Sequence, residues 1–552
     1  MTNSGRFSRR DMLRLASATF GAAATGVTWI DPAHAQRSRR ARQTAPDTGT
    51  GTGTSAIRIR RPVHEMRADD PMLVSYGRAV AEMQRRSRAN PNDPTGWTAQ
   101  AKIHADRCPH SSWFFFPWHR AYLLAFEDIC RQASGDATFT LPYWDWTVAR
   151  AIPAPFANPG GAGNPNPLHN STRDGSADEQ LGSLAESQPA FVTNILRLPE
   201  FDTFGGRMIR NQTSDSRVDW QIAGRQGGRP GGQEGELEGG PHNNVHGAIG
   251  GVMGGYTSPL DPIFWLHHCN VDRLWVVWNQ CSVGGVKRVN TTNPLWLNYT
   301  FNFGGKADFV TPEGRPRVFT VRDVQKVNPL GYSYGNGGTD AGCPGTGDPQ
   351  QRLAKLDVDW VQRSRSIPVN REIRSSAPAS FPLPTPVPTA SPARGLGKGA
   401  AKGAPRNRDL SLPASGEIPS RVVAVFTGIN VPQDPDTVLR VYVGNKGATP
   451  QTPTTDPSFV GTISFFGGDH GAGPAGAAAG HAGHETHKKD VILDLTRALQ
   501  SMKAAGRLPV GNLEVQVVPV SRKGGPAKDV GVSIEKIDVS ANRAAFPSGG
   551  PG

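Results

Sequence analysis

Half of the 14 histidines in this chain fall in two short windows, residues 104–119 and residues 242–268, and this clustering restricts the fold more than any other feature. His242 and His246 are four residues apart, so a helix places both imidazoles on one face, the spacing needed to bind one metal ion. His268 opens a second predicted helix and can add a third nitrogen. The first window can supply a matching set of three imidazoles, from His104, His110 and His119.

Three neutral imidazoles around one metal ion leave open coordination positions and suit copper, which binds nitrogen ligands tightly. A lone histidine is more often a hydrogen-bonded core residue, but two windows that each offer three ligands favour metal binding. Zinc-dependent hydrolysis is the chemical competitor. It is disfavoured because residues 242–246 read HNNVH and lack the glutamate that a H-E-x-x-H metalloprotease uses as its base.

The two windows resemble the two copper signatures of the type-3 copper family of tyrosinases, catechol oxidases and hemocyanins. The resemblance implies a dinuclear site with two copper ions. Copper A would be bound by His104, His110 and His119, and copper B by His242, His246 and His268.

Three neighbouring features take their meaning from the same resemblance. Of the pair at 267 and 268, the family pattern makes the second residue the ligand, which leaves His267 beside the site. Asp272 resembles a helix acid that steadies a ligand imidazole, and the alternative is an ordinary salt bridge with Arg273. Residues 141–146 (LPYWDW) match a further family motif, to which we assign a structural role.

The chain has five cysteines, and an odd number leaves at least one thiol outside any disulfide. Cys108 lies two residues before His110, as in family members whose cysteine forms a thioether to that imidazole. The alternatives for Cys108 are a disulfide partner or a buried thiol. The other four cysteines allow up to two disulfides after export.

Composition and periodicity predict two folded regions in the 552 residues. Residues 57–335 have helical periodicity and turn-rich loops, which indicates a mainly α catalytic domain, a helical bundle that holds the dicopper site. Residues 417–542 alternate as strands, with one short helix near 494–504, which indicates a mostly-β, sandwich-like C-terminal domain. The remaining predicted segments are a signal peptide (1–35), a disordered linker (36–56), a Pro/Gly-rich linker (336–416) and a tail (543–552).

The N-terminus is typical of a twin-arginine export signal. Residues 8–14 (SRRDMLR) precede an apolar run at 15–30 and a small-residue cleavage site at 33–35 (AHA). We therefore expect the twin-arginine machinery to export the protein to the periplasm or beyond. A membrane anchor is the alternative, but the run is too short and too weakly apolar to span a bilayer, so no membrane contact is expected after signal removal.

The formal net charge of +13 does not indicate a nucleic-acid partner, because much of the excess lies in the first 61 residues and at 394–408. Four histidines near the C-terminus could bind copper transiently, although a solvated Gly- and Ala-rich loop is the preferred interpretation; they are His470, His481, His484 and His487.

The resemblance covers residues 57–335 and, more faintly, 417–540, and the layout is most similar to plant polyphenol oxidases. It implies that an arginine at 60–61 stacks near Tyr332 and Tyr334. The C-terminal β domain resembles the one that covers the active site in their latent form, so we predict a latent proenzyme activated by cleavage within 335–416. The N-terminus departs from the pattern, since it lacks those enzymes' cysteine pairs.

The implied activity is oxidation of o-diphenols to o-quinones by dioxygen, with monophenols hydroxylated first if they react. Phenolic small molecules and dioxygen would be the reaction partners. Glu238 and Asn243 match family positions that hold a water proposed as the base, and the alternatives are a surface acid and a helix-start residue. Where many relatives place a bulky gate residue, Gly255 predicts an open entrance.

Two functions compete with an enzyme. Hemocyanin-like carriers share the ligands but protect bound oxygen from substrate, and a copper-storage protein would only hold the metal. The export signal, the single domain of catalytic size and the cleavable cover favour the enzyme.

Overall fold

The computed structural model describes the chain from residue 57 to residue 542, apart from gaps at 209–231, 284–285, 303–304, 336–364, 370–371, 383–420, 431, 433, 435, 467–487, 510–512 and 529–530. The described residues belong to one structural unit. The predicted signal peptide, N-terminal linker, tail and the four C-terminal histidines lie outside them. No helix among the described residues combines the length and the apolar character needed to cross a bilayer.

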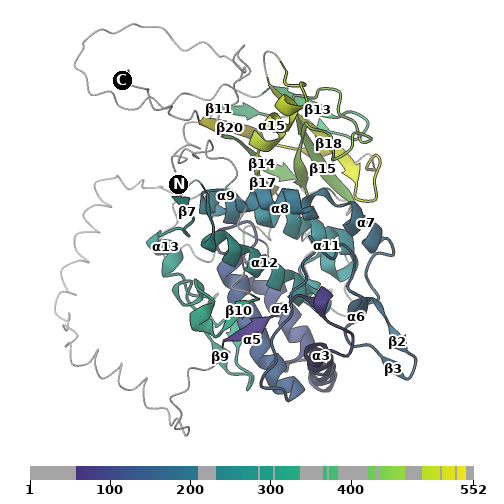
Figure 1. Cartoon of the computed structure of the whole chain (residues 1–552), viewed down its shortest axis with the longest axis vertical. Coiled ribbons are helices and arrows are strands. Elements are labelled where there is room, and N and C mark those ends of the chain that lie inside the picture. Colours follow the sequence, from purple (N-terminus) through teal and green to yellow (C-terminus); the bar gives the residue numbers. More distant parts are fainter. Residues whose placement is uncertain are drawn as a thin grey trace, which may run out of the picture. The chain divides into compact units, whose positions relative to one another are not determined.

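Helices make up the N-terminal part, as predicted (Figure 1). They are α3 (Pro71–Ala89), α4 (Trp97–Arg107), α5 (Phe115–Ser134), α6 (Ala154–Ala157), α7 (Ala177–Ser183), α8 (Pro189–Leu196), α9 (Phe201–Gly205), α11 (Asn243–Ile249), α12 (Ile263–Gln280) and α13 (Pro294–Leu297). A π-helical turn, η4 (Glu238–His242), runs directly into α11.

Local sequence explains where the long helices begin and end. Asp70 caps α3 by accepting a hydrogen bond from the backbone N–H of Met72 at 3.0 Å, and Pro71 takes the first helical position. Gly135 ends α5 in the left-handed conformation, at φ 69°. The central helices α5 and α12 bury nearly every side chain, so they form the core on which the other helices pack.

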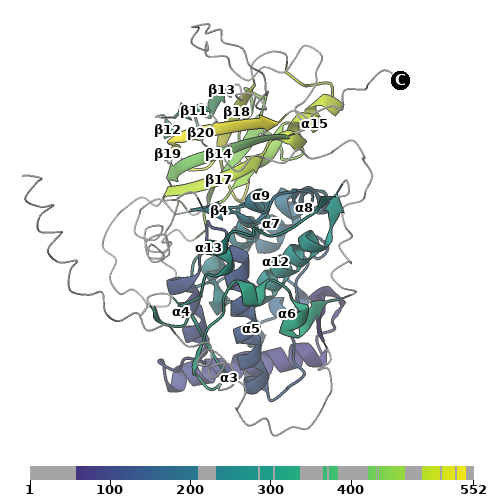
Figure 2. The ribbon, with the colours of Figure 1, turned by 90° about the vertical axis from the view of Figure 1, so that its left-hand side faces the viewer.

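Two four-stranded sheets form the C-terminal part, as the sequence predicts. One sheet has the order β11 (Arg365–Pro368), β20 (Lys536–Asn542), β14 (Arg421–Asn430), β17 (Lys488–Asp494), and Figure 2 shows the last three side by side. The other has the order β13 (Ala379–Pro382), β18 (Glu514–Ser521), β15 (Thr437–Val443), β16 (Phe459–Ile463). Valine, isoleucine and leucine side chains of both sheets fill a common core, and α15 (Thr496–Ala504) packs on it.

Part of the expected 336–416 linker is ordered into strands. β11 and β13 each form the edge of a sheet, and β12 (Glu372–Ile373) pairs with β19 (Val532–Ser533). Pro368 and Pro382 fit these edges because an edge strand does not need every N–H for pairing. The C-terminal β region therefore begins well before residue 417.

The two ends of the helical part are tied together by a short parallel pair. β1 (Arg58–Arg60) pairs with β10 (Tyr332–Tyr334), so Arg60 lies opposite Tyr334. The Arg60 guanidinium lies 3.9 Å from the centre of the Tyr332 ring, which confirms the predicted stacking.

Candidate dinuclear metal site

Three histidines from the first window, which we call trio A, surround one point. His104 comes from α4, His119 from α5 and His110 from the loop between them. Their ring centres are 5.2, 5.4 and 5.5 Å apart, so the rings form an almost equilateral triangle. The structure thus brings together all three predicted copper A ligands.

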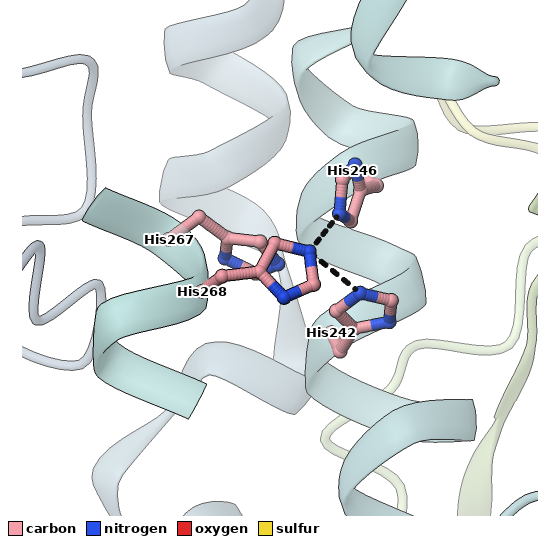
Figure 3. A group of neighbouring side chains, drawn as sticks. All are labelled: His242, His246, His267 and His268. Atoms are coloured by element: carbon pink, nitrogen blue, oxygen red, sulfur yellow. Dashed lines mark hydrogen bonds between the residues drawn. The ribbon is translucent and has the colours of Figure 1, made fainter. Parts of the chain in front are cut away.

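The three predicted copper B ligands, trio B, converge as well (Figure 3). His242 ends η4, His246 lies one turn on in α11, and His268 comes from α12. The Nε2 atom of His268 lies 3.3 Å from the Nε2 atoms of both His242 and His246. Imidazole nitrogens bind a metal ion at about 2.0 Å, and two such nitrogens at tetrahedral positions around one ion are separated by roughly the distance seen here.

The two trios adjoin each other. The rings of His119 and His268 stack with centres 4.3 Å apart and planes 12° apart, and those of His110 and His242 are 5.7 Å apart. Two metal ions held by these trios would be near neighbours, as a dinuclear centre requires. His268 lies within α12, which begins at Ile263 and not at His268 as the sequence indicated.

Outer hydrogen bonds set the tautomer of several rings. The Nδ1 atoms of His104, His119 and His246 lie 2.7, 2.8 and 2.7 Å from the backbone oxygens of Tyr256, Phe115 and Met253. A carbonyl only accepts, so each Nδ1 carries the proton and each Nε2 keeps its lone pair. The Nε2 of His119 is buried without a hydrogen-bond partner among the described residues, which is what a metal ligand needs.

Burial favours the neutral form of four of the six imidazoles. It lowers the pKa of His119 and of His246 to about 3, and it lowers the pKa of His242 and His268 well below the usual value, with neighbouring histidines adding to the effect. Neutral imidazoles are the form that binds a metal, so the donor set fits copper.

His267 belongs to the same cluster but is unsuited to bind the metal through Nε2. The indole N–H of Trp146 donates to His267 Nδ1 at 3.1 Å, so the proton of the neutral ring must lie on Nε2. This bond gives a physical reason to place His267 beside the site and to choose His268 as the ligand.

Cys108 lies against a trio A ring. Its Sγ atom is 3.1 Å from Nδ1 of His110, which suits the predicted thioether without testing it. Cys108, Cys130 and Cys269 are not in disulfides, whereas Cys281 is, with a partner outside the described residues. The disulfide alternative for Cys108 is therefore wrong, and the expected maximum of two disulfides falls to one.

Glu238 and Asn243 are both buried near trio B, and the water they are expected to share stays a prediction. Glu238 accepts a hydrogen bond from the backbone N–H of Ser111 at 2.7 Å, and its other oxygen has no partner among the described residues. Asn243 instead bonds to Glu234 and His242. Burial, followed by the negative charge of Glu234, raises the pKa of Glu238 well above its usual value.

Asp272 forms neither predicted contact. It pairs with Arg120 at 2.6 Å and accepts hydrogen bonds from the hydroxyls of Tyr332 at 2.7 Å and Tyr334 at 2.5 Å. The salt bridge expected between Asp272 and Arg273 is wrong, because Arg273 pairs with Asp145 of the LPYWDW motif at 3.1 Å. Through these contacts Asp272 links α12 to α5 and β10.

Two aromatic rings at the site were missed in the sequence. Phe466, just after β16, has its ring centre 4.9 Å from that of His110 and 4.6 Å from that of His246, so it contacts both trios. The Tyr256 ring lies 5.5 Å from His110. Gly255 has open space where a Cβ would be, and the open entrance at this position stays a prediction.

Family models match both parts of the chain, and related proteins match about half of it. The model of the common central domain of tyrosinase matches residues 87–281, and a domain of unknown function, DUF7868, matches residues 401–542. Polyphenol oxidase C of Solanum lycopersicum is 30% identical over 315 residues, which cover 50% of this chain and 47% of that protein. Tyrosinase HcTyr1 of Hahella sp. is 28% identical over 312 residues, which cover 50% of this chain and 63% of that protein. The chain thus spans about half to two thirds of the length of these relatives.

Solved structures share the fold over most of the chain. A latent aurone synthase (polyphenol oxidase) superposes with a TM-score of 0.57 at 21% identity, covering 88% of this chain and 90% of that one. Latent apple tyrosinase gives a TM-score of 0.54 at 23% identity, covering 88% and 98%. The fold and the two adjoining trios define a dinuclear histidine metalloprotein with a helical core. The domain match and the related sequences support a type-3 copper protein of the tyrosinase and polyphenol oxidase kind.

Proposed function

We propose that the protein oxidises o-diphenols to o-quinones with dioxygen at a dinuclear copper site. The observation that carries this proposal is the convergence of trio A and trio B, with the rings of His119 and His268 in contact. Bound copper would supply the redox chemistry, moving four electrons from two diphenols to one dioxygen, which leaves as two waters. The histidines hold the metal pair, and the buried aromatic surroundings exclude water from it.

We further propose that monophenols are hydroxylated before oxidation, with Glu238 as the proton acceptor. A phenol must lose its proton before it can react, and Glu238 has a buried carboxylate oxygen without a hydrogen-bond partner in the described part of the chain. Burial, followed by the negative charge of Glu234, raises the pKa of Glu238 in the closed site and so disfavours its charged form. Opening the site to water would relieve the burial, lower this pKa and allow Glu238 to accept the phenol proton.

Latency follows from the same closed state. The Phe466 ring fills the space between His110 and His246 that a phenol ring would need. Phe466 follows a strand of the C-terminal part, so removal of that part, after cleavage within 335–416, would vacate the position. We also propose twin-arginine export to the periplasm or beyond, on the sequence pattern of residues 8–35.

The proximity of Cys108 Sγ to the His110 ring supports the thioether. Forming the carbon–sulfur bond removes the thiol hydrogen and one ring hydrogen, and dioxygen would take up the two electrons. The intact mass of the copper-loaded protein should then be lower by two hydrogens beyond the two that the Cys281 disulfide removes, whereas a C108S chain should lose only the two hydrogens of the disulfide.

The test of the function is steady-state oxidation of catechol and of a matched monophenol, before and after limited proteolysis of the copper-loaded chain. Quinone formation that rises after cleavage supports an enzyme with a latent form. Reversible oxygen binding without quinone from either preparation would instead support a carrier, and equal activity before and after cleavage would remove latency.

A further inference from the structure

A buried glutamate that no copper signature includes lies behind trio B. Glu234 is 3% exposed, in the segment between β5 (Gly232–Gln233) and η4. Its Oε2 atom accepts a hydrogen bond from Asn243 Nδ2 at 3.1 Å, and its Oε1 atom accepts one from the Ser111 hydroxyl at 3.0 Å. Neither donor is charged, and burying a carboxylate costs free energy unless a cation pairs with it.

The cation comes from the C-terminal part. Lys489 of β17 places its Nζ atom 2.9 Å from the same Oε2 oxygen, and it also donates to the backbone oxygen of Ser464 at 2.6 Å. Both charged side chains are less than a tenth exposed, so the pair is shielded from solvent. The strand backbone also approaches, as Glu234 forms a β-bridge with Val491.

The bonds of Glu234 decide which way the Asn243 amide faces. A carboxylate can only accept, so the atom of Asn243 that faces Glu234 must be the NH2 group. The amide oxygen then faces Nδ1 of His242, 2.9 Å away, and this nitrogen must donate. The proton is thereby fixed on Nδ1 of His242, and Nε2 retains the lone pair that points toward His268.

Without Glu234 the Asn243 amide could rotate by half a turn, and the proton of His242 would then move to the other ring nitrogen. An NH2 group facing His242 would demand a bare Nδ1 and put the proton on Nε2, where it blocks metal binding. We propose that Glu234 is a positioning residue for copper B. Glu234 orients the Asn243 amide, and the amide in turn sets the tautomer of His242. Lys489 connects the C-terminal part to these contacts. The inference rests on the proposed role of His242 as a copper ligand.

The test measures copper retention in the full-length protein against a chromogenic Cu(I) chelator, so it does not depend on phenol oxidation. The main variant is E234L/K489M, which replaces the buried pair by apolar groups of similar size and avoids an unpaired charge, a change that is often neutral for stability. One of the two copper ions should bind about 10- to 100-fold more weakly, the usual cost of losing an outer partner of a ligand. Wild-type affinity for both ions would overturn the proposal.

Two further variants distinguish a lost orientation of Asn243 from general damage to the structure. Adding N243D to E234L/K489M should restore the affinity, because a carboxylate at 243 presents only acceptors to His242; failure to restore it would contradict the orientation mechanism. The matched control is D174N/K523M, which removes another ion pair between the helical and β parts, 3.0 Å long, and should leave both copper ions bound as in the wild type. If the control loses as much copper affinity as E234L/K489M, the effect comes from the contact between the helical and β parts, and the proposal is overturned.

If E234L/K489M does not fold, E234Q decides. Glutamine keeps an oxygen for Asn243 and Lys489, so the copper affinity should stay within about threefold of wild type, well short of the loss expected when an outer partner is removed. Loss of one copper ion from E234Q would contradict the role of Glu234 as an acceptor. A chain that passes these copper tests but makes no quinone would refute the proposed activity and leave this inference intact.

Discussion

The two histidine trios present similar faces to the metal and differ in what supports the rings from behind. In trio A, His104 and His119 bond to backbone oxygens, and His110 lies against the sulfur of Cys108. In trio B, His246 alone bonds to a backbone oxygen, at Met253. His242 bonds to the Asn243 side chain, and Nδ1 of His268 has no partner among the described residues.

This difference indicates a division of labour. Backbone oxygens of the helical part hold His104 and His119, so the hydrogen bonds that orient these two rings do not involve the C-terminal part. Trio B is reached from β17 through Lys489, Glu234 and Asn243, so its geometry depends on a polar network that crosses to the other part of the molecule. Phe466 and Phe115 each contact rings of both trios, and Phe466 does so from the C-terminal part.

The largest expected effect is the loss of a metal ligand, which tests whether both trios bind copper. H119N and H268N should each lose one copper ion and reduce catechol oxidation by more than about a hundredfold, beyond the cost of losing an outer partner. The control is H64N, at an exposed histidine of the same part of the chain. Metal analysis and steady-state rates give the answer, and full activity in either ligand variant would remove that trio from the site.

A large effect on stability without an effect on the metal is expected at Asp272. D272N should lower the free energy of unfolding by about 3–5 kcal/mol, because it leaves Arg120 buried opposite an uncharged partner. Urea unfolding measures the loss, and metal analysis of the folded fraction should still find two copper ions. Loss of copper B from folded D272N would instead show that the acid steadies His268.

Acid should destabilise the copper-free protein through both trios alike. The pKa values of His119 and His246 are about 3 in the folded state and about 6.5 when unfolded, so only the unfolded chain gains protons between these limits. Stability is therefore lost as the pH falls from 6.5 toward 3, by roughly 2 kcal/mol for each histidine at pH 5. Urea midpoints at pH 7 and pH 5 measure this, and H119N should reduce the pH dependence about as much as H246N. No change in midpoint would contradict the buried neutral state.

The smallest effect is expected from opening the site. F466A should raise catechol oxidation by the uncleaved chain about tenfold, since the burial of a phenylalanine ring contributes about 1.5–3 kcal/mol to the closed state. F191A serves as the control, because Phe191 contacts Arg497 across the same two parts of the molecule but touches neither trio. A rise in F191A as large as that in F466A would show that loosened docking, and not a vacated ring position, governs access.

The sequence predicted the ligands because metal binding imposes short, readable spacings. His242 and His246 must lie on one helical face, and His104, His110 and His119 follow a family pattern. Both folded regions were also predictable from periodicity. The strands β11 and β13 were not, because a Pro-rich edge strand looks like a linker until its partner is known.

The side chains that complete the site could not be predicted from local patterns. Phe466 follows β16, and the alternation of a strand does not tell where a ring just beyond it will point. Glu234 and Lys489 are separated by more than 250 residues, so only the docking of β17 reveals their pairing. The partner of Asp272 was misassigned for a different reason. Arg273 is its neighbour in sequence, but adjacent residues on a helix face different directions.

The most direct test of the account is a metal count on the purified full-length protein, combined with catechol oxidation by the same preparation after limited proteolysis. The account predicts two copper ions per chain and quinone formation that disappears when the copper is removed and returns when it is restored. One copper ion per chain, or zinc in its place, would contradict the dinuclear copper assignment.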